Sequence, residues 1–91
     1  MAEDSALTAY LGREVVLDAA SQYVVLGTLV GEDHRYFILE KADVHDLRDS
    51  KSTRELYLVD CRRHGIRVNR TRVLVTKSEI VSLSALADVE I

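Results

Sequence analysis

With 91 residues, the chain has room for one domain, and its content of 47% hydrophobic and 30% charged residues excludes a linker or a disordered tail. Its single cysteine, Cys61, cannot form an internal disulfide, and no apolar run is long enough for a signal peptide or a membrane span. We therefore expect one cytoplasmic domain over residues 1–91 that has no membrane partner.

A short helix and a strand are the first predicted elements. Asp4 or Ser5 is placed to cap a helix that runs to Leu11, and Gly12 is suited to the position just after its last residue. Because a helix this short is not stable alone, we expect it to dock against the sheet. Residues 13–18 then alternate between apolar and polar side chains, which is typical of a half-buried strand.

The strand predicted over Tyr23–Val30 forms the centre of the expected core. Its residues are almost all β-branched or aromatic, and both of its faces are apolar, so it must be covered on both sides. Gly27 interrupts this strand and indicates a sharp bend or a close approach of another backbone. A third strand begins at Tyr36–Leu39 and fades into the polar residues 40–43, which completes a three-stranded antiparallel meander.

The segment after the meander allows two interpretations. Ser52 and Glu55 form a capping-box pattern, and Gly65 after a run of basic residues is typical of the end of a helix, so we predict a helix over about residues 53–64. The alternative is a long strand, because Leu56–Val59 is an unbroken apolar run.

Two more short strands are predicted at Arg72–Thr76 and Ile80–Leu83. Only Lys77, Ser78 and Glu79 separate them in the sequence. A junction this tight suggests one ribbon bent at the corner of a small barrel.

These elements and their order resemble the Sm-like (LSm/Hfq) family. Gly27, Leu29 and Asp33 have the spacing of the Gly-x-Leu-x-x-x-Asp core of its first motif, and Leu11-Gly12-Arg13-Glu14-Val15 resembles the start of its first strand. Residues 75–83 have the outline of its second motif, which is an apolar strand, a polar corner and another apolar strand.

The resemblance covers roughly residues 5–85 and implies a mainly β fold. We expect a small, strongly bent, five-stranded antiparallel barrel with a short N-terminal helix. Residues 44–70 are then a helical insertion between the third and fourth strands.

The resemblance also implies an assembly. An open five-stranded sheet leaves unpaired backbone groups on its two outer strands, and Sm-like subunits pair these edges with each other around a ring. We therefore expect the chain to be its own partner in a homo-oligomeric ring. The residues expected to be partly buried by the neighbouring subunit are Leu74, Ile80 and Leu83.

Single-stranded RNA is the ligand that the family suggests, but two departures argue against the usual uridine readout. Phe37 stands in place of an asparagine that hydrogen-bonds the base, and we expect it to lie in the core. Thr76-Lys77 stands where the family often has Arg-Gly.

Arg35 lies in the loop where the family often has a stacking side chain, and its guanidinium could lie flat on a base. Asp33 is expected to orient this loop by binding backbone amides.

Clustered basic residues in the second half of the chain are candidate phosphate contacts. Together with the loop arginine described above, they make up the candidate RNA-binding residues, which are Arg35, Arg62, Arg63, Arg67, Arg70, Arg72 and Lys77. Two functions remain open. The chain is either an RNA-binding, RNA-chaperone-like module with weak sequence preference, or a ring-shaped structural or protein-interaction scaffold in which these arginines pair with acidic neighbours.

We expect no enzyme activity, no cofactor, no catalytic residue and no metal site. Asp43, His45 and Asp46 lie close together in the sequence, but they lack the paired-ligand spacing of known metal sites. Cys61 and His64 are one helical turn apart, without a visible group that would orient the histidine or stabilise an oxyanion. The sequence also lacks a glycine-rich phosphate-binding loop.

Overall fold

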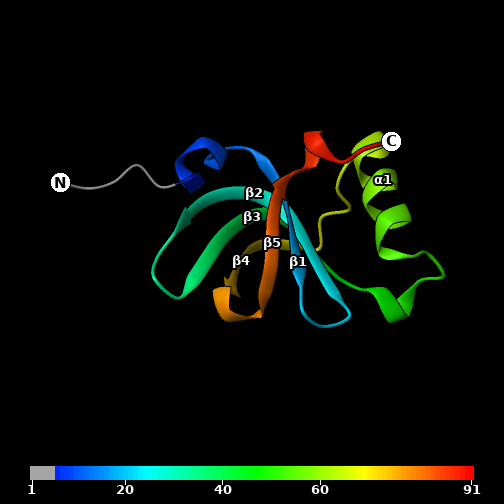
Figure 1. Cartoon of the computed structure of the whole chain (residues 1–91), viewed down its shortest axis with the longest axis horizontal. Coiled ribbons are helices and arrows are strands. Elements are labelled where there is room, and N and C mark those ends of the chain that lie inside the picture. The colour runs from blue at the N-terminus through cyan, green and yellow to red at the C-terminus, as the bar shows by residue number, and fades with distance from the viewer. Residues whose placement is uncertain (1–5) are drawn as a thin grey trace.

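The computed structural model describes residues 6–91, so the predicted capping residues Asp4 and Ser5 lie outside the described part of the chain. A five-stranded sheet and one α-helix dominate the architecture (Figure 1). Within the described residues, no helix is both long enough and apolar enough to cross a membrane.

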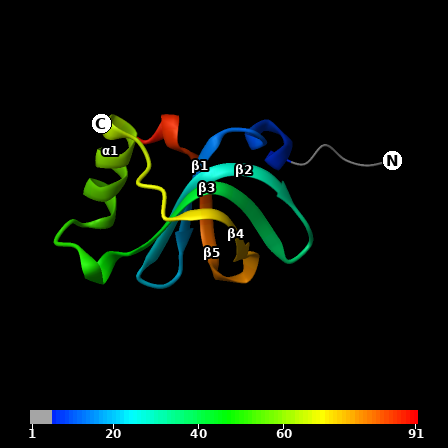
Figure 2. The same cartoon turned by 180° about the vertical axis from the view of Figure 1, so that it is seen from behind.

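The sheet is antiparallel throughout, and its strand order is β4-β3-β2-β1-β5. The five strands are β1 (Glu14–Ala19), β2 (Tyr23–Glu32), β3 (Tyr36–Asp46), β4 (Arg70–Thr76) and β5 (Ile80–Ala85). β4 and β5 are the two outer strands, and the 3-10 helix η3 (Lys77–Glu79) connects them. The sheet curves so strongly that both outer strands border one groove, and they lie close together in the views from both sides (Figures 1 and 2).

The sheet bends where β2 crosses β3, at Gly27 and Lys41. The register between the two strands shifts between Leu26 and Thr28. A Cβ atom on Gly27 would lie 3.0 Å from the Cβ atom of Ala42, so only glycine allows the strands to approach this closely. On β3, Lys41 has a φ of 50°, which is the left-handed conformation that L-residues rarely adopt. The bend predicted at Gly27 is confirmed.

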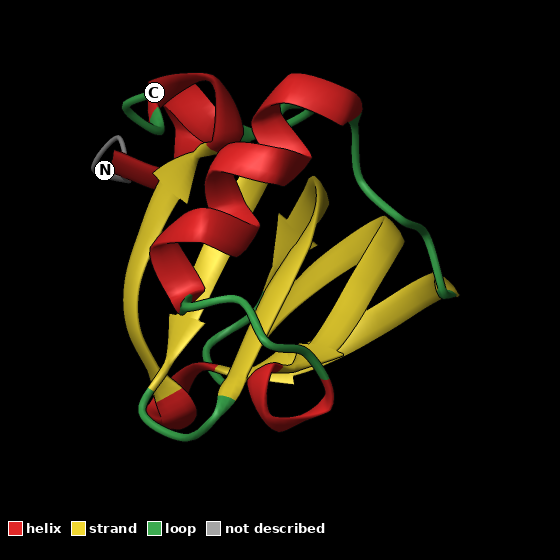
Figure 3. Ribbon diagram, turned by 90° about the vertical axis from the view of Figure 1, so that its right-hand side faces the viewer, coloured by secondary structure: helices red, strands yellow, loops and turns green. Residues whose placement is uncertain are grey.

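Two apolar clusters pack on opposite faces of the sheet, and β2 contributes to both. The inner cluster lies on the face where β4 and β5 approach each other and contains Val15, Leu17, Val25, Leu29, Phe37, Leu39 and Ala42. The outer cluster lies between the sheet and helix α1 (Arg54–His64) and contains Val16, Val24, Leu26, Tyr57, Leu58, Cys61 and Leu86. Helix α1 therefore covers the face of the sheet that the barrel itself leaves open (Figure 3).

Of the two interpretations of residues 53–64, the helix is correct, but its predicted capping residue is wrong. The hydroxyl of Thr53, and not of Ser52, accepts a hydrogen bond from the backbone N–H of Leu56, at 3.2 Å. Both residue types can cap a helix. The helix therefore begins at Arg54, one residue later than a cap at Ser52 would have set it. At the other end, Gly65 has a φ of 94° and its N–H donates to the carbonyl of Cys61 at 2.8 Å, as expected for the residue after a helix.

The remaining elements differ from the predictions in length and type. The N-terminal helix is a 3-10 helix, η1 (Ala6–Tyr10), and it docks on the inner cluster through Leu7 and Tyr10. β3 continues to Asp46 because its polar second half pairs with the first half of β2. The segment between β3 and β4 is therefore residues 47–69, and it contains the short 3-10 helix η2 (Leu47–Asp49) as well as α1.

Candidate nucleic-acid interface

A pocket of about 290 Å³ lies between the β2–β3 turn and η3. It is lined by His34, Arg35, Thr76, Lys77 and Ser78. The pairing of β3 with β4 places Tyr36 opposite Thr76, and the backbone N–H of Lys77 donates to the carbonyl of Arg35 at 2.9 Å. The fold thus brings two candidate RNA contacts, Arg35 and Lys77, into one pocket, which we call the turn pocket.

Asp33 holds the β2–β3 turn in shape. One oxygen of its carboxylate accepts hydrogen bonds from the backbone N–H groups of Arg35 and Tyr36, both at 2.7 Å. These two hydrogen bonds favour the ionised form and lower the pKa of the Asp33 carboxyl below its usual value. The role predicted for Asp33, binding backbone amides to orient the loop, is confirmed.

Two contacts hold the side chain of Lys77 in place at the turn pocket. Its ammonium group forms an ion pair with the carboxylate of Glu32 and lies 5.2 Å from the centre of the Phe37 ring. Phe37 is buried in the inner cluster, as expected. Because Lys77 covers the exposed side of this ring, a base cannot stack on Phe37 while Lys77 stays in place.

Arg35 is the exposed cation of the turn pocket. Its guanidinium lies 5.9 Å from the centre of the Tyr36 ring, and it forms no ion pair with any residue in the described range 6–91. The N–H donors of its guanidinium form no hydrogen bond within residues 6–91 and are therefore available to a ligand, whereas its backbone N–H donates to Asp33.

The other candidate phosphate contacts differ in whether an acid already neutralises them. Arg67 pairs with Asp60, and Arg72 pairs with Glu40 at 2.9 Å. Arg70 donates to the backbone carbonyl of Asn69 at 3.0 Å. The two remaining candidates, Arg62 and Arg63, are exposed in the last turn of α1, and neither has an acidic partner among the residues described. RNA contact by all seven basic residues stays a prediction.

A groove of about 350 Å³ separates the outer strands β4 and β5. Leu74, which is 52% exposed, and Ile80 both line it. Leu83 instead packs against the inner cluster. Val81 was not among the predicted interface residues, yet it is 74% exposed on β5, because neighbouring strand residues point to opposite faces. A subunit contact through Leu74, Ile80 and Leu83 stays a prediction.

The residues considered for a metal site have other partners in the structure. Asp43 is only 2% exposed, and its carboxylate accepts hydrogen bonds from the hydroxyl of Tyr57 and, at 3.0 Å, from the amide of Asn69. His45 stacks on Tyr57 with ring centres 3.8 Å apart, and Asp46 pairs with Arg48. No group of three His, Cys, Asp or Glu residues within 6–91 is placed to hold a metal ion.

The contacts of Asp43 instead join α1 to β3. Burial and the hydrogen bond to Asp43 both raise the pKa of the Tyr57 hydroxyl, so Tyr57 remains a neutral donor. Cys61, one turn further along α1, is buried, and burial raises the pKa of its thiol. Neither environment activates a nucleophile.

Comparison with known proteins identifies the fold but not a close relative. No family model matches the sequence. No curated protein matches it either. A structure of an Sm protein from Pyrococcus abyssii in complex with a uridine heptamer is similar, with a TM-score of 0.59 and 13% identity over 90% of this chain and 99% of that one.

Chains in two crystal structures of the NatC complex are also similar. For the complex bound to CoA, the TM-score is 0.58 with 13% identity over 92% of this chain and 88% of that one. For the complex bound to a Gag peptide and CoA, the TM-score is 0.55 with 14% identity over 85% of this chain and 86% of that one. At these identities the likeness describes the fold alone.

Proposed function

The chain has the Sm-like fold, and from this premise we propose that it is the subunit of a homo-oligomeric ring that binds single-stranded RNA in the turn pocket. The observation that carries the proposal is the placement of Arg35 and Lys77 at one pocket formed by two segments far apart in the sequence. An Sm protein with this fold was solved with bound uridine RNA. We propose a binding role without catalysis, in the cytoplasm.

The residues of the turn pocket favour stacking over readout of base edges. The unpaired guanidinium of Arg35 can lie on the face of any base, since every base has a π-face. Phe37 is buried and carries no group that can hydrogen-bond a base edge. We therefore expect RNA affinity to depend strongly on Arg35 and to differ little among the four bases.

The outer strands support the proposed ring. β4 and β5 each have one side without a partner strand in the described chain, and such edges favour pairing with another chain. The groove between them is lined by apolar residues of both strands, and α1 does not contribute to it. Pairing of β4 in one copy with β5 in the next would cover Leu74 and repeat until the ring closes.

The substitution Arg35→Ala tests the RNA site. We expect binding of a fluorescently labelled uridine oligomer to weaken roughly tenfold, because the stacking of one base contributes about 1–3 kcal/mol. Fluorescence anisotropy at low salt measures the affinity. Lys51→Ala is the matched control, since Lys51 is also exposed and cationic but precedes α1, away from the turn pocket. Equal affinities for the two variants would reject the site.

The structure also gives one reason to retain the scaffold function as the alternative. The ion pair between Glu32 and Lys77 already neutralises one of the two cations of the turn pocket. Chains of similar fold also occur in the NatC complex. A scaffold would assemble with itself or with a partner protein and would not bind oligonucleotides even at low salt, whereas phosphate contacts are strongest under those conditions.

A further inference from the structure

A second pocket contains two arginines that lack acidic partners within residues 6–91. It has a volume of about 400 Å³ and is lined by Arg13, Glu14, Arg62, Leu86 and Ala87. Arg13 directly precedes β1, Glu14 is the first residue of β1, and the other residues come from the last turn of α1 and the 3-10 helix η4 (Leu86–Asp88). We call it the arginine pocket. It shares no lining residue with the turn pocket.

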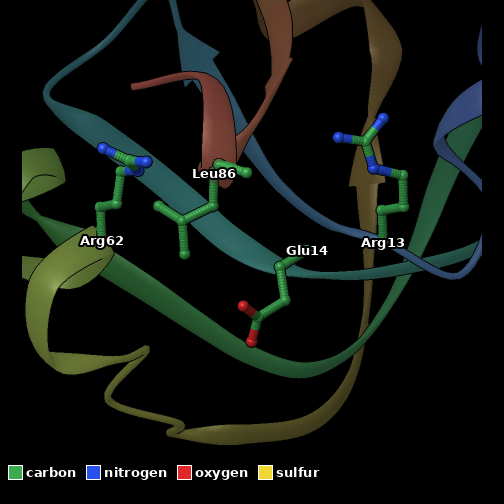
Figure 4. Close-up of a pocket in the computed structure, with 5 residues that line it drawn as sticks. Arg13, Glu14, Arg62 and Leu86 are labelled. Carbon is green, nitrogen blue, oxygen red and sulfur yellow. The ribbon is translucent and has the colours of Figure 1, made fainter. Parts of the chain in front are cut away.

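Figure 4 shows how the charged groups are arranged around the arginine pocket. The guanidinium groups of Arg13 and Arg62 lie on either side of Leu86, and the carboxylate of Glu14 points away from both. No ion pair joins either arginine to Glu14 or to another acid in the described part of the chain. Leu86 is anchored in the outer cluster and gives the pocket a fixed apolar floor.

Ion pairs with acids are common but not general among the cations of residues 6–91, since the residues Arg35, Lys41, Lys51, Arg63 and Arg70 also form none there. Elsewhere in the described chain, five cations pair with carboxylates, namely Arg48, Arg54, Arg67, Arg72 and Lys77. The protein has more acids than bases, with a net charge of −3, so acidic partners are not scarce. Arg13 and Arg62 differ from these other unpaired cations because they line the same pocket.

The helix dipole explains only one of the two arginines. Arg62 lies in the last turn of α1, where a positive charge is favourable next to the free carbonyl groups. Arg13 precedes β1 and has no such reason to be there; its guanidinium lies 5.5 Å from the centre of the Tyr10 ring. An anionic ligand that reaches both sides of Leu86 would contact both guanidinium groups.

We propose that the arginine pocket binds phosphate groups, and that their source is the backbone of a single-stranded nucleic acid. Guanidinium groups bind phosphate oxygens through two parallel hydrogen bonds, and two of them can hold one phosphate or two successive phosphates. Arg63, which is also exposed and lacks an acidic partner among the described residues, extends the positive surface beyond the pocket. The proposal rests on the pocket itself and remains valid if the turn pocket binds no RNA.

The test follows the side-chain Nε–Hε signals of the arginines by NMR while a short uridine oligomer is added to the full-length protein. We expect the signals of Arg13 and Arg62 to shift together. The signal of Arg48, which is paired with Asp46, should stay unchanged. A parallel titration with inorganic phosphate and with a nucleoside triphosphate distinguishes a free phosphate source from the nucleic-acid backbone.

Binding measurements on the variants complete the test. In Arg13→Gln/Arg62→Gln, we expect the slope of log affinity against log salt to fall by about 0.7 for each phosphate of a single strand that no longer binds an arginine. Lys51→Gln removes a positive charge at the opposite end of α1 and should leave the slope unchanged. Arg35→Ala should weaken binding without altering the shifts of Arg13 and Arg62, which separates the two sites.

Three results would overturn the proposal. Unchanged Arg13 and Arg62 signals with every phosphate compound would show that the pocket binds none. Shifts caused only by free phosphate would reject the nucleic-acid backbone as the source. A higher affinity of the pocket for a polyglutamate peptide than for the oligomer would assign it to acidic proteins instead.

Discussion

At the scale of single residues, the chain accepts an unfavourable backbone conformation at Lys41 in order to bend β3. Its φ of 50° places Lys41 in the left-handed region, while its side chain is exposed and forms no ion pair within residues 6–91. The strain is therefore separable from any interaction of the side chain. Gly27, directly across the bend, is required because of space and not because of its backbone conformation, since a Cβ atom there would collide with β3.

Lys41→Gly should therefore stabilise the protein. We expect the free energy of unfolding to rise by about 0.5–1 kcal/mol, because glycine adopts positive φ without steric cost. Urea denaturation measures the change. Lys51→Gly is the control, because Lys51 is an exposed lysine with negative φ, and there glycine should leave stability unchanged or reduce it. If Lys41→Gly and Lys51→Gly changed the free energy of unfolding by the same amount, the conformation of Lys41 would not be strained.

Sequence patterns located the residues whose role is local, but not those whose role depends on distant partners. Asp33 could be assigned because its hydrogen bonds reach only two and three residues along the chain. The partners of Asp43 are Tyr57 and Asn69, which lie in later segments. No local pattern distinguishes a buried, satisfied carboxylate from a loop aspartate. Arg13 was overlooked as a candidate phosphate contact for the same reason, because α1 and η4 complete its pocket.

At the scale of secondary-structure elements, periodicity predicted the strands and capping signals predicted the helix. The first half of β3 was found because it is apolar. Its second half was mistaken for a fading strand because residues 40–43 are mostly polar, and this half also contains the polar side chains of Asp43, His45 and Asp46. These side chains are satisfied by Asn69, Ser50 and Arg48, and the strand pairs with β2 throughout. Tertiary pairing thus extended an element that local composition would have ended.

The cap of α1 gives a sharp prediction at this scale. Thr53→Ala should lower the free energy of unfolding by about 1 kcal/mol, because the N–H of Leu56 loses its side-chain acceptor. Ser52→Ala, one residue earlier, should change it by less than about 0.5 kcal/mol, as expected for an exposed position that does not cap the helix. Chemical denaturation of both variants provides the comparison. A larger loss of stability in Ser52→Ala than in Thr53→Ala would show that Ser52 caps the helix, as the sequence suggested.

At the scale of the whole molecule, the inner cluster, the groove and the two free edges of the sheet are continuous with one another. The bent sheet buries most of its inner face. At the groove between β4 and β5, however, Leu74 and Ile80 remain accessible. The insertion between β3 and β4 covers the opposite face through Tyr57, Leu58 and Cys61. The chain has thus added a helix to the Sm-like barrel without covering either edge.

Edge substitutions separate assembly from folding. Leu74→Asp should abolish the ring while leaving the subunit folded, since Leu74 is half exposed and a charge there would face the neighbouring copy. Ile80→Asp should give monomers or unfolded protein, because Ile80 also packs against the inner cluster. Leu56→Asp is the matched control: Leu56 is 62% exposed on α1, and its replacement should leave the assembly unchanged. Mass measurement with circular dichroism distinguishes these cases, and a folded Leu74→Asp protein of unchanged assembly mass would contradict the proposed interface.

The most direct measurement of the central claim is native mass spectrometry of the full-length protein purified without nuclease. We predict one discrete mass of several subunits that carries additional mass, and we predict that nuclease treatment removes the addition but leaves the ring. A ring of bare subunits before treatment would contradict RNA as the ligand, and a monomer would contradict the ring itself.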